Sequence, residues 1–398
     1  MSTINGDTGG IIHCDVLIVG AGFSGIASLY RVRKLGLEAK VFEGGTDFGG
    51  VWYWNRYPGA RVDSEFPFYQ LNIPEAYRSW NFTQRYPDHA ELRRYMAHLD
   101  KTLDLRKDVQ FNAQVVDARY NTEDAKWTVK TSAGHTATGK YLILATGLLH
   151  RRYSPDFPGL KDYKGVLHHS ASWPEDTSCK GKNVAIIGAG ATSVQIVQEW
   201  AKETADDGGS LTMFMRRPST CLPMGQRPLT TQEQSQWKAY FMRLFQEGRK
   251  SAAGFPSKGP DHGVFDVSAE EREAFFEELW GRGGFGYFMA NYNNVLLDLK
   301  ANRAMYDFWA KKVRARMTDP VKQDLMAPLE PVYPIGTKRP PLEHDYYECL
   351  DMKHVEIVDL NKTPLKTFTE KGMLMEDGKE REFDVVVLAT GFDSFTGS

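Results

Sequence analysis

Two glycine-rich turns in this chain have the spacing that holds the phosphates of a dinucleotide. They read Gly20-Ala-Gly22-Phe23-Ser24-Gly25, after the apolar run 16–19, and Gly188-Ala-Gly190-Ala191-Thr192-Ser193, after the apolar run 184–187. In a strand–turn–helix unit of this type, the first glycine makes the turn and the second lets the diphosphate approach the backbone. The third small residue packs the helix on the strand, and the diphosphate lies at the helix N-terminus. The sequence therefore predicts two dinucleotide sites built from these turns.

The residues that follow the two turns carry opposite charge. After the first turn, the expected strand 38–42 ends at Glu43, whose carboxylate can accept a hydrogen bond from a ribose 2′-hydroxyl. After the second, the expected strand 211–215 ends at Arg216 and Arg217, two cations that suit a 2′-phosphate. The first site is therefore predicted to take FAD or NAD and the second NADPH. Such a pair passes electrons from nicotinamide to a second redox carrier, for which flavin is the natural acceptor.

The elements that must position these turns predict an α/β fold with two Rossmann-like dinucleotide-binding domains. Two nearly identical segments, 141–147 and 385–391, run from apolar residues into Ala-Thr-Gly and are expected to be buried parallel strands that close the two units. Their ends, at Gly147 and at Thr390 with Gly391, are expected to contact the cofactors, because glycine lets the backbone approach a ligand.

The pattern along the chain divides it into seven parts. They are a disordered tail (1–12), an FAD-binding domain (13–150), a linker (151–174), the first part of an NADPH-binding domain (175–227), a helical insertion (228–330), the return of the NADPH-binding domain (331–391), and the start of a further FAD-domain segment (392–398).

The insertion is expected to be helical. One apolar face of a single helix is predicted from the spacing i, i+3, i+4, i+7, i+8 of Trp237, Tyr240, Phe241, Leu244 and Phe245. Ser268, followed by Glu271, is typical of a capping box that starts the next helix. A further helical run is expected from Asn294 to about Met317, stopped by Pro320. Core packing is the favoured role of these aromatic residues, although an all-helical insertion could also roof a substrate cleft.

Composition limits the class of protein. With 398 residues, a net charge of −2 and 25% charged residues, the chain suits two or three domains and gives no sign of a nucleic-acid or anionic-membrane partner. It has no apolar run long enough for a transmembrane helix, and its polar first ten residues do not resemble a signal peptide. The four cysteines form no CxxC pair, which excludes a disulfide framework and fits the reducing cytoplasm.

A segment between the two units reads Tyr163-x-Gly165-x-x-x-His169-x-x-x-Trp173. It resembles the fingerprint of the Baeyer–Villiger monooxygenases, F-x-G-x-x-x-H-x-x-x-W, with Tyr163 in place of the usual Phe. The resemblance implies a connection that couples the domains, so His169 is not expected to be a general base. Adjacent histidines such as His168 and His169 lack the spacing of metal ligands, and no metal is predicted.

A second block follows the first ribose-reading carboxylate. It reads Gly49-Gly50-Val51-Trp52-x-x-Asn55-x-Tyr57-Pro58-Gly59-x-x-x-Asp63 and resembles the same family's G-G-x-W-x-x-N-x-Y-P-G-x-x-x-D. Gly49 and Gly50 are expected to allow backbone contact with a flavin, and Trp52 with Tyr57 to supply flat walls. Val51 is also expected to contact the cofactor. The resemblance implies that Asp63 lies beside the flavin and pairs with a catalytic arginine.

A third block supplies that arginine. The run Pro334-Ile-Gly336-Thr337-Lys338-Arg339 resembles the family's P-x-G-x-K-R and is followed by Asp345-Tyr346-Tyr347. The resemblance places Arg339 over the flavin, and Lys338 with Arg216 near the 2′-phosphate of NADPH. Arg217 stands where the family usually has a smaller hydroxyl residue, so it either adds a phosphate contact or faces water.

The resemblance extends over nearly the whole chain and implies an FAD-containing, NADPH-dependent Baeyer–Villiger monooxygenase. Such an enzyme converts a small-molecule ketone and O2 into an ester or lactone through a C4a-peroxyflavin, here stabilised by Arg339 and with Asp63 orienting the guanidinium. Arginine suits a peroxyanion because it keeps its proton when desolvated. A cytoplasmic location is expected, and the sequence does not specify the ketone, the regiochemistry or the oligomeric state. Family members usually continue past residue 391 into a long C-terminal region, which residues 392–398 are expected to begin.

Two alternatives stay open at this stage. One is a related flavin monooxygenase that oxygenates nitrogen or sulfur, which would use the same two dinucleotides without needing Arg339. The other is a protein that binds FAD and NADPH with little turnover. A flavin disulfide reductase is excluded because the chain has no CxxC pair.

Overall fold

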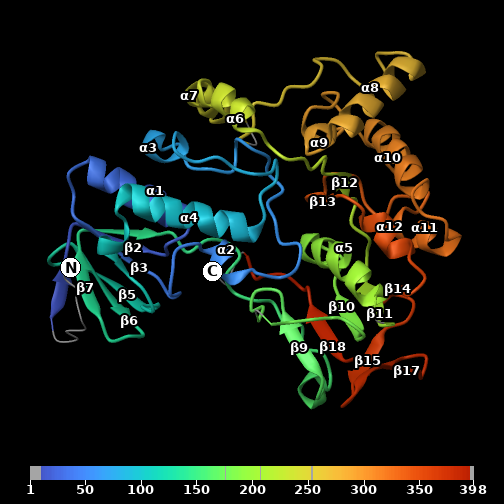
Figure 1. The fold of residues 1–398 in the computed structure, drawn as a ribbon, viewed down its shortest axis with the longest axis horizontal. Coiled ribbons are helices and arrows are strands. Elements are labelled where there is room, and N and C mark those ends of the chain that lie inside the picture. Colours follow the sequence, from blue (N-terminus) through green and yellow to red (C-terminus); the bar gives the residue numbers. More distant parts are fainter. Residues whose placement is uncertain (1–9, 175, 207, 252–253, 395–398) are drawn as a thin grey trace.

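The computed structural model describes residues 10–174, 176–206, 208–251 and 254–394. Each glycine-rich turn begins a helix on one of two parallel sheets, so the predicted α/β class is confirmed. Figure 1 shows the first unit at the left, the second at the lower right, and the orange helices of the insertion along the right-hand side.

The first unit is a four-stranded parallel sheet with a second, mainly antiparallel sheet beside it. The parallel sheet has the order β4 (Val109–Gln110), β3 (Ala39–Phe42), β2 (Val16–Val19), β8 (Tyr141–Leu144). The other sheet has the order β1 (Ile11–His13), β7 (Thr136–Gly139), β6 (Lys126–Thr131), β5 (Val115–Asn121). The helices are α1 (Phe23–Lys34), α2 (Val51–Trp54), α3 (Pro74–Tyr77), α4 (His89–Leu103) and the 3-10 turn η1 (Arg106–Asp108).

The second unit is a five-stranded, all-parallel sheet. Its order is β14 (Val355–Asp359), β11 (Ser210–Met215), β10 (Asn183–Ile187), β18 (Val385–Leu388), β9 (Val166–His169). The helices are α5 (Ala191–Ala205), which follows the second turn, and α12 (Tyr346–Asp351), with the 3-10 turn η2 (Leu160–Asp162). A small antiparallel sheet of β15 (Leu365–Phe368), β16 (Gly372–Met375) and β17 (Glu380–Glu382) completes it.

The insertion leaves and re-enters the second unit at one place, because the short strands β12 (Leu222–Pro223) and β13 (Leu342–Glu343) pair in parallel. Its helices are α6 (Thr231–Lys238), α7 (Phe241–Gly248), α8 (Ala269–Arg282), α9 (Gly286–Met289), α10 (Leu299–Arg314) and α11 (Pro320–Met326). The predicted capping box is present at the start of α8, where Ser268 and Glu271 exchange hydrogen bonds.

The predictions for the insertion were wrong in two places. The expected single helix is two helices, α6 and α7, with a break at Ala239 and Tyr240. Of the five residues of the predicted apolar face, Phe241 is buried, whereas Tyr240 is 61% exposed. Pro320 starts α11 instead of stopping a helix, because proline is well tolerated in the first helical turn, where no backbone donor is needed.

Three predicted segment assignments also need correction. Residues 11 and 12, assigned to the tail, belong to β1, which pairs with β7; residues 1–9 of that tail lie outside the described residues. The predicted linker contributes β9, an edge strand that pairs with β18. The closing strand β18 is buried as predicted, but β8 lies at a sheet edge, and its Leu144 is 66% exposed.

The last described residues pair with the start of the linker. The Asp393 N–H donates to the Arg151 carbonyl at 3.0 Å, and Phe392 forms a β-bridge with Arg152. Residues 395–398 of the predicted further FAD-domain segment lie outside the described residues.

One hydrophobic core extends through all three parts. The same cluster of buried side chains contains Ile18 of the first unit, Trp200 of the second and Trp309 of the insertion. The three parts are therefore packed against each other, and the relative placement of their polar side chains follows from that packing. In the described residues, no helix is long and apolar enough to cross a bilayer.

A buried ion pair fixes the insertion to the segment that carries Arg339. Arg316, after α10, donates from both terminal nitrogens to the fully buried Glu343 at 2.6 and 3.0 Å, and it also bonds to Glu348. Removing one partner of a buried pair leaves the other charge without compensation.

The substitution Arg316→Ala is expected to lower the free energy of unfolding by about 3–5 kcal/mol, because the Glu343 carboxylate stays buried. Urea denaturation followed by circular dichroism measures this change. The control is Arg243→Ala, which removes an exposed i,i+4 pair with Glu247 and should leave the free energy of unfolding nearly unchanged. Equal losses in the two variants would contradict the assignment of Arg316.

Candidate active site

The backbone of the first glycine-rich turn is closely packed. A Cβ on Gly25 would lie 1.9 Å from the Gly20 carbonyl oxygen, so only glycine lets α1 pack this closely on the end of β2. Gly22 faces Gly50, since a Cβ on either residue would lie 3.0–3.3 Å from the Cα of the other. The two glycines form a floor without side chains between the N-termini of α1 and α2, which fits the backbone approach of a diphosphate.

Glu43, the carboxylate predicted to bind the ribose hydroxyl, lies directly beneath this turn. Glu43 is 7% exposed, and its two oxygens accept hydrogen bonds from the Ala21 and Gly45 amides, each at 2.7 Å. A carboxylate oxygen has a further lone pair, so each can also accept from a ribose hydroxyl. The residues around the first turn therefore fit the nucleotide part of FAD.

An aromatic wall lies beside the floor. The Trp52 indole N–H donates to the Tyr69 hydroxyl at 2.9 Å, and the Tyr69 ring packs edge-on against Phe23 with ring centres 5.2 Å apart. Val51 and Ser24 lie on the same two helices, half-buried and exposed respectively. Sequence reasoning missed Tyr69, for which the only signal was the density of aromatic residues after Asp63.

The structure brings Asp63 and Arg339 together across 276 residues of sequence. Arg339 Nε donates to Asp63 Oδ2 at 2.8 Å, and an Nη nitrogen donates to Oδ1 at 2.6 Å, which makes the pair bidentate. The guanidinium also lies 4.9 Å from the centre of the Phe285 ring. Burial raises the pKa of the neighbouring Tyr69 phenol, and both charges of the pair act on it, which places the pair beside the aromatic wall.

The loop that carries Asp63 is attached to the helix of the second turn. The Tyr57 hydroxyl donates to Gln195 Oε1 at 2.9 Å, and Gln195 Nε2 donates to the Arg61 carbonyl at 3.0 Å. Gly59 packs on the same helix, where a Cβ would lie 2.6 Å from the Gln195 carbonyl oxygen. Burial raises the pKa of Tyr57, so the phenol stays protonated and donates. Sequence reasoning missed Gln195, because a glutamine inside a helix gives no signal.

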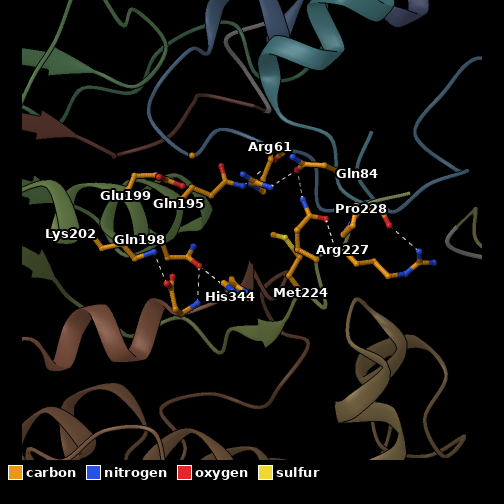
Figure 2. Close-up of a pocket in the computed structure, with 13 residues that line it drawn as sticks. Arg61, Gln84, Gln195, Gln198, Glu199, Lys202, Met224, Arg227, Pro228 and His344 are labelled. Atoms are coloured by element: carbon orange, nitrogen blue, oxygen red, sulfur yellow. Dashed lines mark hydrogen bonds and ion pairs between the residues drawn. The ribbon is translucent and has the colours of Figure 1, made fainter. Parts of the chain in front are cut away.

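A cavity of about 410 Å³ opens next to this attachment. Figure 2 shows its lining side chains, with Gln195, Gln198 and Lys202 on α5 facing Arg61, Gln84 and Arg227. The lining contains Gln195 but none of the residues predicted to contact a cofactor. The cavity is therefore a separate space, lined by Gly59 and Arg61 of the Tyr57–Asp63 loop and by Gln195, which bonds to that loop.

The second turn repeats the plan of the first. Gly188 has φ +127°, a value suited to glycine, and a Cβ there would lie 2.4 Å from the Ala389 carbonyl. Gly190 and Ala191 are exposed, and Thr192 is half-buried. Ser193 is fully buried, and its hydroxyl has no hydrogen-bond partner within the described part of the chain. The exposed end of this turn fits a ligand phosphate.

The predicted 2′-phosphate cations lie at the ends of two segments. Arg216 and Arg217 are exposed directly after β11, and Lys338 is exposed beside Arg339. The Asn361 side-chain amide donates a hydrogen bond to the Arg216 carbonyl, and the Ser219 hydroxyl donates to the Ala189 carbonyl of the second turn at 2.5 Å. These contacts tie the cation-bearing segment to the glycine-rich turn.

The closing-strand residues lie where the two units join. Gly147 and Gly391 both have positive φ, and a Cβ on either would meet no atom within 4 Å. The Thr390 hydroxyl donates to the Tyr153 carbonyl at 2.5 Å, and a ring nitrogen of His169 lies 3.3 Å from the same oxygen. Burial lowers the pKa of His169, so its ring is neutral near pH 7. In the described residues, His, Cys, Asp and Glu form no group of three that could hold a metal.

Comparisons with known proteins agree with this geometry. The family model "Flavin-binding monooxygenase-like" matches residues 14–209. The FAD-binding monooxygenase acrE of Aspergillus aculeatus is 47% identical over 97% of this chain and 65% of its own length. Cyclopentanone 1,2-monooxygenase of Comamonas sp. is 40% identical over 96% of this chain and 69% of its own length. The chain thus spans about two thirds of these relatives, 65% and 69%.

Solved structures show the same arrangement of units. Oxidized steroid monooxygenase bound to NADP superposes with a TM-score of 0.89 at 35% identity, covering 96% of this chain and 72% of the other. Cyclohexanone monooxygenase from Rhodococcus sp. Phi1 bound to NADP+ gives a TM-score of 0.90 at 33% identity, covering 97% and 72%. The chain therefore belongs to the flavin-binding monooxygenases and, within them, to the Baeyer–Villiger type.

Proposed function

We propose that this chain binds FAD and NADPH and, with O2, converts a ketone into an ester or lactone. The observation that supports this most is the bidentate Arg339–Asp63 pair beside the aromatic wall of Trp52 and Tyr69. FAD and NADP are the cofactors of the family to which the chain belongs, and the two glycine-rich turns with Glu43 and Arg216 suit them. When bound, FAD that NADPH has reduced supplies the electrons that activate O2.

Arg339 would supply the fixed positive charge of the reaction. Inserting oxygen beside a ketone carbonyl places negative charge on oxygen atoms, and a pre-positioned cation stabilises that charge without reorganisation. A guanidinium keeps its charge where a lysine can lose its proton on desolvation. Arg339 is therefore the residue that we assign to charge stabilisation.

Asp63 would orient the Arg339 guanidinium toward the reacting oxygens. It accepts from Nε and one Nη nitrogen of Arg339, so the other Nη nitrogen has no acceptor among the described residues. That nitrogen can donate to an oxygen of the reacting group. Phe285 supports the guanidinium plane at 4.9 Å. The aspartate and the ring together hold the arginine in one orientation.

Nitrogen oxygenation is the second candidate function. Phenazine N-monooxygenase PhzNO1 of Lysobacter antibioticus is 34% identical over 97% of this chain and 70% of its own length. A nucleophilic nitrogen attacks a protonated oxygen donor, so this reaction would not need the Arg339 charge. The two functions differ in the substrate that is oxygenated, a ketone or a nitrogen heterocycle.

The test of the proposed function supplies FAD-containing protein with NADPH, O2 and either a cyclic ketone or an aromatic N-heterocycle. Mass spectrometry of the products, with NADPH consumption followed in parallel, is expected to show lactone from the ketone. N-oxide from the heterocycle without lactone would favour the second candidate. NADPH oxidation that yields only hydrogen peroxide with both substrates would contradict the proposal.

The substitution Arg339→Lys is expected to lower the rate of lactone formation by about 100-fold or more, because a lysine cannot form the bidentate contact with Asp63. FAD content should stay at the wild-type level. Product analysis and flavin absorbance measure the two quantities. Arg56→Lys, a change in the loop between α2 and Asp63, serves as the control and should form lactone at near the wild-type rate. The same rate in Arg339→Lys would overturn the role of Arg339.

The substitution Glu43→Ala is expected to weaken FAD binding by about 10- to 100-fold, because the Ala21 and Gly45 amides and the ribose hydroxyls lose their acceptor. The flavin content per protein after dialysis, and titration with FAD, measure the effect. Glu38→Ala, an exposed carboxylate five positions earlier, should retain the wild-type affinity. Unchanged flavin content in Glu43→Ala would show that Glu43 does not read the ribose.

The substitution Gln195→Met is expected to lower the yield of lactone per NADPH oxidised, because the Tyr57–Asp63 loop loses both hydrogen bonds to α5. The loss of two buried bonds also lowers the free energy of unfolding by about 1–3 kcal/mol. Gln226→Met is the matched control, since Gln226 lines the same cavity and bonds to Gln84 and Tyr86 instead. An equal fall in yield in both variants would contradict a specific role for Gln195.

A further inference from the structure

The cations at the end of β11 and before Arg339 have no carboxylate partner among the described residues. Arg216, Arg217 and Lys338 form no ion pair within the described residues, and all three are exposed. Several other cations of the chain are paired: Lys202 with Asp345 at 2.5 Å, and Arg314 with Asp324 at 2.8 Å. Unpaired cations that come from two separate segments leave a site for an external anion.

Tyr333 joins the two segments that carry these cations. Its hydroxyl donates to the Pro218 carbonyl, directly after Arg217, at 2.5 Å. Its ring lies beneath the Lys338 ammonium, with Nζ 5.1 Å from the ring centre. Burial raises the pKa of the Tyr333 phenol, and the charge of Arg217 acts on it from nearby. One side chain therefore touches the Arg217 segment with its hydroxyl and the Lys338 ammonium with its face.

The Tyr333 contact continues a chain of hydrogen bonds from the second turn. Ser219 donates to the Ala189 carbonyl inside that turn, and Pro218, its neighbour, accepts from Tyr333. Through these contacts, the position of Lys338 is fixed relative to the backbone that would hold the diphosphate. A free lysine side chain samples many rotamers, and contact with an aromatic face restricts that freedom before the ligand arrives.

We propose that Tyr333 is a positioning residue that sets the distance between Lys338 and Arg217 and thereby makes the chain prefer NADPH to NADH. This inference rests on the proposed NADPH site and adds the residue that determines its selectivity. It also assigns Arg217 to the 2′-phosphate, one of the two roles that its sequence position left open. A tyrosine that served only to pack the insertion would affect both nucleotides equally.

The test compares binding of 2′,5′-ADP, which carries the 2′-phosphate, with binding of 5′-AMP, which does not. Tyr333→Leu removes both the ring and the hydroxyl, and isothermal calorimetry should show about tenfold weaker binding of 2′,5′-ADP. Tyr333→Phe keeps the ring and should lose about threefold. Binding of 5′-AMP should stay within about twofold of the wild type in both variants. The ratio of the KM values for NADH and NADPH should fall by the same factors.

Tyr306→Phe is the matched control. The Tyr306 hydroxyl donates to the Pro328 carbonyl at 2.6 Å in the same part of the insertion, and no lysine of the described residues lies over its ring. This variant should retain the wild-type preference for 2′,5′-ADP. An equal loss of 2′,5′-ADP and 5′-AMP binding in the Tyr333 variants, or no loss, would overturn the role of Tyr333.

A fourth variant separates this inference from the proposed function. Lys338→Ala removes the ammonium itself and should weaken 2′,5′-ADP binding by about 10- to 100-fold. If Lys338→Ala has this effect and the Tyr333 variants do not, the NADPH site stands and the positioning role fails. If Lys338→Ala leaves 2′,5′-ADP binding unchanged, the proposed NADPH site itself is wrong.

Discussion

The ion pair between Asp63 and Arg339 is the contact that the rest of the structure serves. Its partners come from different units, 276 residues apart, and their side chains are 30% and 63% exposed. A pair this exposed contributes only about 0–1 kcal/mol to stability, so it cannot hold the units together. The dependence runs the other way: the units must be placed correctly by other interactions before the pair can form.

Those other interactions are mostly apolar, with a few buried polar contacts at the joints. A single hydrophobic core runs through both units and the insertion. Gln195 attaches the loop of Asp63 to α5, and Glu343 with Arg316 attaches the segment after Arg339 to the insertion. Tyr333, five residues before Lys338, and Phe285, between α8 and α9, contact Lys338 and Arg339 through their rings. The charged groups Arg339 and Lys338 stay exposed, while the groups that position them are buried (Gln195, Glu343) or half-buried (Tyr333, Phe285).

The features that residue patterns alone could predict are local, whereas the distant pairing of Asp63 with Arg339 was expected from the family resemblance. A glycine-rich turn between an apolar strand and a helix is specified within about ten residues, and a carboxylate such as Glu43 follows at a constant spacing. The helix break at Tyr240 and the exposure of Leu144 depend on what packs nearby, which the periodicity of apolar residues does not contain. The roles of Gln195 and Tyr333 arise from contacts between distant segments, so no spacing of residues along the sequence could predict them.

A double-mutant cycle on Asp63 and Arg339 tests the central claim most directly. The rate of lactone formation is measured for Asp63→Ala, Arg339→Ala and the double variant, each with its flavin content matched to the wild type. If the aspartate acts only through the arginine, the double variant should be no slower than Arg339→Ala alone, with a coupling energy of about 1–3 kcal/mol. Losses that multiply in the double variant would show that the two residues act independently and would contradict the account.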